Sequence, residues 1–357
     1  MRVEQNRKKI ETLYVLGAGA SKALTYRKPR SGTYSRQTCP VDRDFISCIE
    51  AQQRTTGWQS RTFDSVKRAW LAASEFKEQG LESAILRRVG DYNLLSKLNP
   101  RRTRNQQANE EFLNNVSHLI ADYLAGCHAN SARRDRAFVN KVFPGGTPIT
   151  GYANRIITFN YDLVIDRPLL ERFSPRKIYF DRLVDQVADG TARPATQKFA
   201  EPLLLKLHGS LNWRCDRSYF DQIVLGTVDP TIEIPICISH GRCPSPDDNE
   251  SPLIIPPVPE KPITRASIFS FLWTLAFEYL HEARRIVLVG YSCPPTDTLA
   301  QAMFCHFRAR RAEEIVIVDP NPQIITRYRE MLKPSLPLST RWTYFDDFAT
   351  FIDSETS

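Results

Sequence analysis

The sequence lacks the features that would place a protein in or across a membrane. It contains no run of about 18 apolar residues, the length needed to cross the hydrocarbon core of a bilayer. Residues 1–10 are polar and have no apolar stretch of the kind found in a secretory signal peptide. We therefore expect a cytoplasmic protein without membrane contact.

Closely spaced cysteine pairs are also missing. The eight cysteines are scattered through a long chain, and no two of them have CxxC spacing. Such scattering favours reduced thiols or a metal site over a disulfide framework. Internal repeats and low-complexity tracts are absent as well, which excludes a repeat array. The cysteines are Cys39, Cys48, Cys127, Cys215, Cys237, Cys243, Cys293 and Cys305.

Basic residues are in modest excess. There are 48 Lys and Arg against 40 Asp and Glu, which gives a formal net charge of +8. Basic clusters occur at residues 100–104, 133–136 and 308–311, and each contains or adjoins polar or acidic residues. This mixture is typical of solvated helix faces and loops, so we do not expect direct binding to nucleic acid.

The composition is that of an ordinary globular protein, with 42% hydrophobic and 25% charged residues in 357. A chain of this length can bury a substantial core in one large domain or two. Short apolar runs alternate with segments of helical periodicity, which predicts an α/β fold: a Rossmann-like open parallel sheet with helices on both faces. The predicted strands are residues 13–16, 155–159, 203–207, 286–290 and 315–319.

Helical periodicity dominates one long internal segment. Its clearest sign is the apolar stripe from Phe112 to Leu124. At the C-terminal end, the last dozen residues are expected to be partly frayed. The predicted organisation is residues 1–42 as the first part of the Rossmann-like domain, 43–148 as a mainly helical insertion, and 149–357 as the remainder, with a polar insertion at 214–250.

A glycine-rich turn, Gly17-Ala-Gly19-Ala-Ser21, follows the first predicted strand and opens a helix. Glycine lets the backbone bend sharply and approach a pyrophosphate, while N–H groups at a helix start supply donors and a positive dipole end. The turn therefore predicts a phosphate cradle for a dinucleotide. Turns of this type are common, so the rest of the chain must support the prediction.

Polar residues directly follow each of the predicted parallel strands, at the edge where open α/β sheets bind ligands. Each group also has an ordinary explanation, as a helix cap, a turn or a hydrogen-bonded core histidine. Several such groups in one chain favour a ligand site over separate structural roles. The groups are Gly17–Ser21, Asn160–Asp162, His208–Ser210, Gly290–Ser292 and Asp319–Asn321.

With these motifs the chain resembles the sirtuin-like NAD-consuming family, in particular the bacterial sirtuin-like NAD hydrolases of antiphage defence. The resemblance spans most of the chain outside the helical segment. The matching pieces are Gly17–Ser21 as the phosphate turn, Pro40–Phe45 as the segment after the cofactor loop, Thr158–Asp162 as the Asn-x-Asp element, Leu207–Ser210 as the His-Gly element, and Gly290–Ser292 and Val318–Asn321 as the turns that hold the adenosine half.

The resemblance implies a role for each matching residue in cleaving NAD+. Asn160 would position the nicotinamide ribose and the attacking water, and His208 would bind ribose hydroxyls or act as general base. Asp162 would orient the nicotinamide amide or stabilise the developing cation. The residues implied for the rest of NAD+ are Gly17, Ala18, Gly19, Ala20 and Ser21 at the pyrophosphate, Gly290 and Ser292 at a phosphate or the adenosine ribose, Asp319 and Asn321 at the adenosine ribose, and Asp44 and Arg43 as further contacts.

The chain departs from protein-deacylating sirtuins, which usually carry a zinc ribbon with two CxxC pairs after the His-Gly element. Here Cys215, Cys237, His240 and Cys243 fall in that interval, and three thiolates with one imidazole suit tetrahedral zinc. Their spacing is unconventional and buried cysteines are common, so we do not expect zinc. Because the zinc ribbon is missing, we favour protein deacylation less than the other activities of this family.

Two functions of different classes remain open. The first is an NAD+ glycohydrolase that depletes NAD+ as the effector of a bacterial antiphage defence system. The second is a regulatory subunit that binds NAD+ or ADP-ribose without turnover. An NAD-dependent deacylase is a weaker third choice beside these two. The resemblance also implies a homo-oligomer and a separate partner subunit, either a translocase-type ATPase or an Argonaute-like protein.

Overall fold

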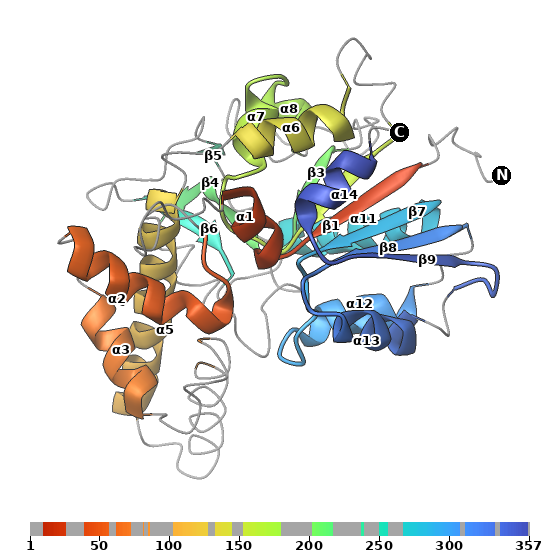
Figure 1. Ribbon diagram of the computed structural model, residues 1–357. Coiled ribbons are helices and arrows are strands. Elements are labelled where there is room, and N and C mark those ends of the chain that lie inside the picture. The colour runs from red at the N-terminus through yellow and green to blue at the C-terminus, as the bar shows by residue number, and fades with distance from the viewer. Residues whose placement is uncertain are drawn as a thin grey trace.

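The fold is built on a six-stranded, entirely parallel sheet with the strand order β3-β2-β1-β7-β8-β9 (Figure 1). Its strands are β1 (Thr12–Leu16), β2 (Arg155–Thr158), β3 (Leu204–Lys206), β7 (Arg285–Val289), β8 (Glu314–Val318) and β9 (Arg341–Phe345). The computed structural model describes residues 10–25, 39–56, 62–72, 81, 85, 103–127, 133–144, 153–179, 202–216, 237–238, 250–255, 267–307, 311–332 and 336–355.

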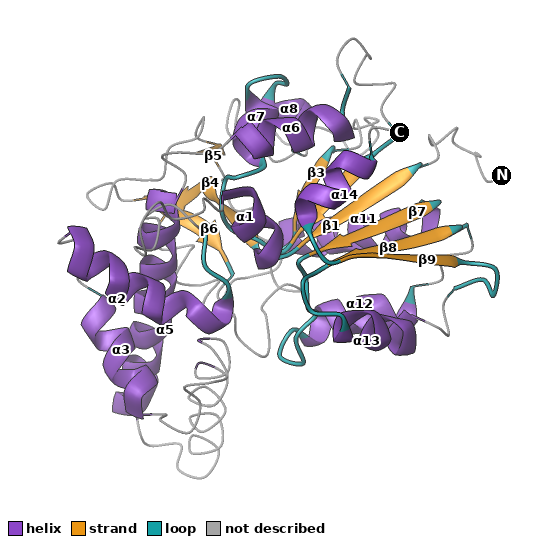
Figure 2. Ribbon diagram, in the orientation of Figure 1, coloured by secondary structure: helices purple, strands orange, loops and turns teal. Residues whose placement is uncertain are grey.

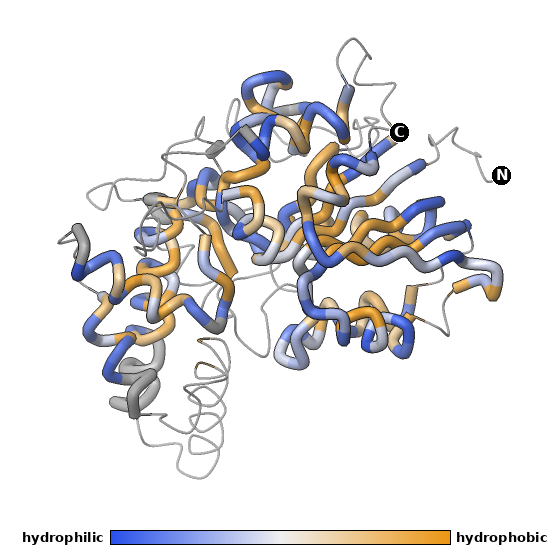
Figure 3. The backbone as a smooth tube through the Cα atoms, viewed as in Figure 1, coloured by the Kyte–Doolittle hydropathy of each residue, from blue (hydrophilic) through white to orange (hydrophobic). Residues whose placement is uncertain are grey.

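The central strands are apolar because both faces of the sheet are covered. Every residue of β1, β2 and β3 is buried, and so are the last four residues of β7 and β8. Hydrophobic residues accordingly concentrate along the middle of the sheet (Figure 3). These five strands confirm the Rossmann-like parallel sheet predicted from the apolar runs.

The sequence prediction missed the sixth strand, β9. As the edge strand it pairs only with β8, and its residues are half-buried or exposed. Polar residues Arg341 and Thr343 alternate with aromatic ones, so the segment lacks the continuous apolar run that marked its neighbours.

Helices cover both faces of the sheet. On one face lie α1 (Ala18–Thr25) and α14 (Phe348–Ser354), and on the opposite face lie α12 (Thr298–His306) and α13 (Gln323–Leu332) (Figures 1 and 2). Helix α11 (Ser267–Glu282) packs against β3, where Trp273 Nε1 donates to the carbonyl of Leu207 at 3.1 Å. The arrangement confirms helices on both faces of an open sheet.

The strand order creates a topological switch point between β1 and β7. The chain runs outward from β1 to β2 and β3, then returns through α11 to β7 on the other side of β1. Leu16 is in register with both Thr158 and Val289, so the turns after β1, β2 and β7 begin side by side. Ligands of open α/β sheets bind at this place.

A small antiparallel sheet follows β3, with the order β5-β4-β6. Its strands are β4 (Gly209–Asp216), β5 (Cys237–Ile238) and β6 (Glu250–Ile254). The chain turns at His208, so β4 leaves the parallel sheet and pairs with β6. Gly209 allows this turn with a φ of 86°.

The predicted helical segment contains α2 (Phe45–Thr56), α3 (Phe63–Ala72), α5 (Thr103–Cys127) and α6 (Arg133–Val142), preceded by the 3₁₀ turn Asp42–Asp44. The stripe on α5 is buried, and Tyr123 contacts the ring of Phe45 on α2 with centroids 5.5 Å apart. Helix α6 instead packs against α1 and against the short helix α7 (Asp166–Leu170), which precedes α8 (Pro175–Ile178). No helix in the described ranges has the length and hydropathy of a membrane span.

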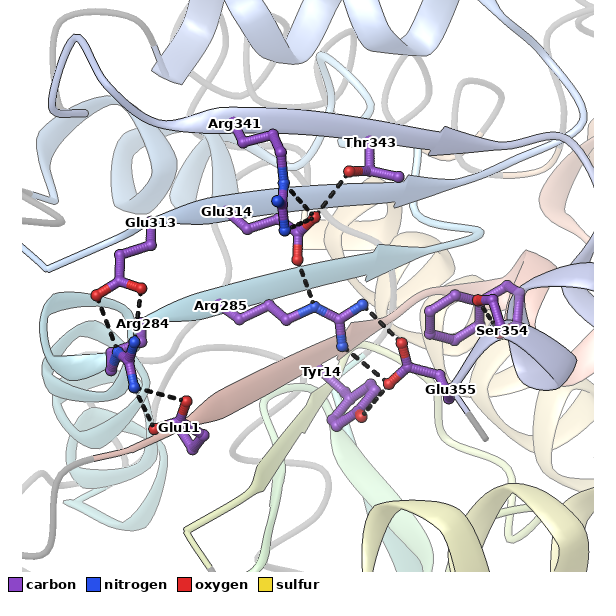
Figure 4. A network of polar contacts seen from close by, with 11 residues as sticks. Glu11, Tyr14, Arg284, Arg285, Glu313, Glu314, Arg341, Thr343, Ser354 and Glu355 are labelled. Carbon is purple, nitrogen blue, oxygen red and sulfur yellow. Dashed lines mark hydrogen bonds and ion pairs between the residues drawn. The ribbon is translucent and has the colours of Figure 1, made fainter. Parts of the chain in front are cut away.

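The C-terminal segment is docked, and the expectation of a frayed end is wrong for residues 346–355. Phe351 of α14 is buried, and Glu355 accepts from both Arg285 nitrogens Nη1 and Nη2 at 2.8 and 2.6 Å (Figure 4). Tyr14 of β1 donates to the same carboxylate at 3.0 Å, and Glu314 binds Arg285 Nε at 2.9 Å. This network lies where β7 and β8 start, at the end of the sheet opposite the switch point.

Candidate functional site

Two glycine turns meet at the switch point. The N–H of Gly19 donates to the carbonyl of Gly290 at 2.9 Å, and the N–H of Gly17 donates to Val289 at 3.0 Å. A Cβ on Gly17 would lie 2.5 Å from the Gly290 oxygen, and one on Gly290 would lie 2.4 Å from the nitrogen of Ala20. Gly290 also has a φ of 56°, which side chains disfavour. The two turns therefore require glycine in order to pack together.

This packing uses N–H groups that the sequence pattern had assigned to a pyrophosphate. Gly17 donates to the last residue of β7, Gly19 donates to the turn after it, and Ala20 donates to the carbonyl of Gly17 at 2.9 Å. Ala18 is half-buried, whereas Ser21 is buried and faces the turn after β2. The glycines thus have a structural role that needs no ligand, although the helix they open starts at the switch point.

Asn160 joins the turn after β2 to the glycine turn. Its Nδ2 lies 2.8 Å from the carbonyl oxygen of Gly17 and 2.8 Å from Oγ of Ser21, and the side chain is half-buried. The amide has two hydrogens, so these contacts use both of them. The oxygen Oδ1 is the atom through which this side chain can accept a bond from a ligand.

Asp162 follows Asn160 by two residues in the sequence, and it is buried, with 6% of its surface exposed. Its Oδ1 accepts from the N–H of Val164 at 3.0 Å, and Ser21 also hydrogen-bonds to the carboxyl group. Burial raises the pKa of Asp162, against the lowering effects of Lys206 and of these hydrogen bonds. Asp162 therefore supports Ser21 and its own turn from the protein interior.

A buried ion pair holds the same turn from the other side. Lys206, the last residue of β3, is fully buried and donates to Asp166 Oδ2 at 2.8 Å and to the backbone oxygen of Asp162 at 2.5 Å. The hydroxyl of Tyr179 donates to the second oxygen of Asp166, and Asn212 of β4 donates to that hydroxyl at 3.0 Å. Burial, with the charge of Asp166, raises the pKa of Tyr179. The network ties β3, the turn after β2 and β4 together.

Sequence reasoning missed this network. Lys206 stands inside the predicted strand 203–207, and Asp166 lies outside the polar groups that mark the strand ends. A lysine inside the run Leu203–Leu207 was the available signal, since a charge in a fully buried strand requires a partner.

His208 occupies the turn between β3 and β4 and is 6% exposed. Aromatic rings surround its imidazole: the ring centroids of Phe159, Trp273 and Tyr161 lie 5.3, 6.1 and 6.2 Å away. Its backbone oxygen accepts from Ile255 at 2.8 Å, which secures the turn to the end of β6. The side chain is thus enclosed by apolar surfaces beside the turn that holds Asn160.

Asp297 forms a charged contact with this histidine, which no local sequence pattern predicts. Its Oδ2 lies 3.5 Å from Nε2 of His208 and accepts from the hydroxyl of Tyr291 at 2.9 Å. Its Oδ1 accepts from the N–H of Ala300, so Asp297 is the N-cap of α12. An aspartate before a helix is explained by capping alone, and nothing local links it to His208.

The residues implied for the adenosine half lie at the same sheet edge. Ser292 is exposed in the turn after β7. Asp319 follows β8, two strands from β1, and accepts from the N–H of Asn321 at 2.9 Å, while Asn321 Oδ1 accepts from Gln323 at 3.1 Å and opens α13. Burial raises the pKa of Asp319. Both side chains therefore shape a turn next to the switch point.

Asp44 forms an ion pair with Lys22, a residue of α1. Its Oδ1 also accepts from the N–H of Val41 at 2.7 Å. These contacts attach the segment after the predicted cofactor loop to α1. The side chain of Arg43 lies outside the described part of the chain.

The predicted Cys/His set is only partly described. Cys215 is buried in β4. Cys237 of β5 is in register with Arg214, the residue before Cys215. His240 and Cys243 lie outside the described residues. In the described ranges, no group of three or more His, Cys, Asp and Glu is placed to hold a metal, and the described cysteines form no disulfide.

Sequence comparisons assign no family to these residues, because the chain matches no protein-family model and no curated protein.

Proposed function

We propose that the protein is an NAD+ glycohydrolase, which cleaves NAD+ to nicotinamide and ADP-ribose. The observation that carries the proposal is the contact of Asn160 with Gly17 and Ser21 at the switch point, beside the turn that holds His208. The contact holds Asn160 at the start of α1, and the ring of the next residue, Tyr161, lies 6.2 Å from the imidazole of His208.

The strand order supports a dinucleotide as the ligand. Sheets with this order bind dinucleotides across the crevice at the switch, with the pyrophosphate near the start of the first helix. Ala18 begins that helix, and Ser292 is exposed in the neighbouring turn. The nicotinamide ribose would then extend toward Asn160 and His208, and the adenosine half toward Asp319 and Asn321.

Hydrolysis suits the two side chains better than hydride transfer does. In the reaction, the bond from ribose C1′ to the nicotinamide nitrogen breaks and its electron pair neutralises the pyridinium. A water oxygen bonds to C1′ and loses a proton, as in other oxocarbenium-like glycoside hydrolyses. Asn160 Oδ1 would accept a hydrogen bond from the ribose or the water, and His208 would take the proton.

A regulatory subunit that binds NAD+ or ADP-ribose without turnover is the second candidate. The burial of His208 and the internal bonds of the Gly17, Gly19 and Ala20 N–H groups favour it. Those features also fit a hydrolase that is held inactive until a partner rearranges the edge of the sheet. The role as an antiphage effector, the homo-oligomer and the ATPase or Argonaute-like partner rest on the resemblance alone.

Nicotinamide release from NAD+ tests the proposal. The purified chain is assayed alone and with candidate partners, and the variants Asn160→Ala and His208→Ala are compared with it. Matched controls are Asn140→Ala on α6 and His306→Ala on α12, since both side chains are exposed. We expect release by the wild type and both controls, and loss of about 10²-fold or more in the two site variants.

Each other outcome has a defined meaning. If NAD+ binds measurably but stays intact under every condition, the result would contradict the glycohydrolase and favour the regulatory subunit. Release that requires an acetylated peptide would identify a deacylase. Site variants as active as the wild type would overturn the assignment of Asn160 and His208.

A further inference from the structure

We propose that Asp297 is a positioning residue for His208, whose carboxylate holds the imidazole in one orientation and favours its protonated form at the edge of the sheet. The inference deepens the proposed NAD+ glycohydrolase, because His208 is the proton acceptor there. It rests on a contact between the turn after β3 and the start of α12, which are distant in the chain.

The first observation is the geometry of the pair. Asp297 Oδ2 and His208 Nε2 are 3.5 Å apart, and the two side chains are 3% and 8% exposed. A carboxylate at this distance from an imidazole attracts the positive charge that the imidazole gains on protonation. The low exposure reduces screening by solvent, so the interaction is stronger than it would be at the surface.

The second observation is that two hydrogen bonds orient the Asp297 carboxylate. Ala300 N–H holds Oδ1, and the hydroxyl of Tyr291 holds Oδ2 at 2.9 Å. Tyr291 is itself fixed, because its ring stacks on Phe159 with centroids 4.0 Å apart and an angle of 7° between the planes. The N-terminus of α12 adds a positive dipole end that stabilises the ionised carboxylate.

The other groups around His208 do not replace this carboxylate. Tyr161 approaches from the turn after β2 but donates its hydroxyl to Ile255, and Trp273 of α11 donates to Leu207. Lys206 of β3 is bound to Asp166. Phe159 contributes only its ring. The pair with Asp297 therefore supplies a carboxylate that these four side chains do not offer to the imidazole.

The decisive variant is Asp297→Asn. Asparagine caps helices as well as aspartate does, so its oxygen can keep the Ala300 N–H while its Nδ2 takes the place of Oδ2 and donates to the Tyr291 hydroxyl. The variant therefore removes the charge and keeps the helix cap. The matched control is Asp347→Asn, which makes the same change at the N-cap of α14, away from His208. A second variant, Tyr291→Phe, removes one hydrogen-bond donor of the carboxylate but keeps its charge and its bond to the Ala300 N–H.

The first measurement does not depend on activity. The full chain is labelled with ¹³C in the histidine rings, the His208 signal is assigned with His208→Ala, and its titration midpoint is followed by NMR. We expect Asp297→Asn to lower the midpoint, Tyr291→Phe to raise it or leave it in place, and Asp347→Asn to have no effect. An unchanged midpoint in folded Asp297→Asn, or a lowered one in Tyr291→Phe, would overturn the inference.

The second measurement is the pH profile of nicotinamide release. We expect Asp297→Asn to reduce kcat by at least about tenfold, to change KM much less, and to move the profile in the direction of the NMR midpoint. A lowered midpoint in a chain that releases no nicotinamide would support the pair and contradict the glycohydrolase. Normal release with an unmoved profile would contradict the pair and support the glycohydrolase.

Discussion

Asn160 donates to Ser21 Oγ at 2.8 Å, and this contact joins the turn after β2 to the first helix of the fold. Ser21 in turn hydrogen-bonds to the buried carboxyl group of Asp162. The serine that the glycine-rich motif assigns to a phosphate is therefore the centre of a polar chain that positions Asn160.

Replacing Ser21 with Ala should destabilise the protein and reduce its activity. The change leaves Asn160 without one acceptor and a buried carboxyl group without a donor, which typically costs about 1–3 kcal/mol. Urea unfolding measures the loss, and Ser339→Ala at an exposed position is the control. If Ser21→Ala unfolds at the wild-type urea concentration, the polar chain does not support this turn.

Gly290→Ala should disrupt the switch point. The new Cβ would meet the nitrogen of Ala20 at 2.4 Å, and the φ of 56° is unfavourable for alanine. Strain of this kind costs on the order of 1–3 kcal/mol, and the displaced turns should weaken NAD+ binding. Calorimetric binding of NAD+ and a thermal melt test both effects. Ser292→Ala, two residues later in the same turn, should melt like the wild type.

Lys206→Met should be among the most damaging single substitutions. It leaves the Asp166 carboxylate buried without its cation, and breaking a buried pair in this way costs about 3–5 kcal/mol. Adding Asp166→Asn removes the uncompensated charge, so the double variant should recover part of the loss. Denaturant unfolding of the two variants tests this. Lys177→Met, at an exposed position, is the control. A double variant less stable than Lys206→Met would contradict the explanation.

The ion pairs at the opposite end of the sheet should make stability depend on acid pH. Burial alone would raise the pKa of Glu314, but hydrogen bonds and charge from Thr343, Arg285 and Arg341 hold it below its ordinary value. A lowered carboxyl pKa contributes stability above the unfolded value of about 4.3, and this contribution is lost as pH falls through the folded pKa.

Melting temperatures of the wild type and Glu314→Gln should therefore differ at pH 7 and converge as the pH falls below about 4. Glu313→Gln is the matched control, because hydrogen bonding to Arg284 lowers the pKa of Glu313 as well but its side chain is exposed. The exposed pair is screened by solvent and should matter less. A constant difference across the pH range would show that the charge of Glu314 is not the cause.

The sequence was sufficient to predict the strands that are buried on both faces. Their continuous apolar runs separate them from the helices, whose apolar residues are spaced to cover one side. It was insufficient for β9 and for the turn of β4 out of the parallel sheet. An edge strand needs no continuous apolar run, and the partner of β4 lies in β6, on the other side of a long intervening segment.

The strand pattern was enough to predict that polar groups such as Asn160 and His208 gather at one edge, because parallel strands all end there. Which of these groups touch one another depends on the three-dimensional arrangement of the chain. Strand pairing puts Gly17 between Gly290 and Asn160, and packing of α12 brings Asp297 to His208. Such contacts depend on the order of the strands and on segments far apart in the chain, which local patterns of residues do not encode.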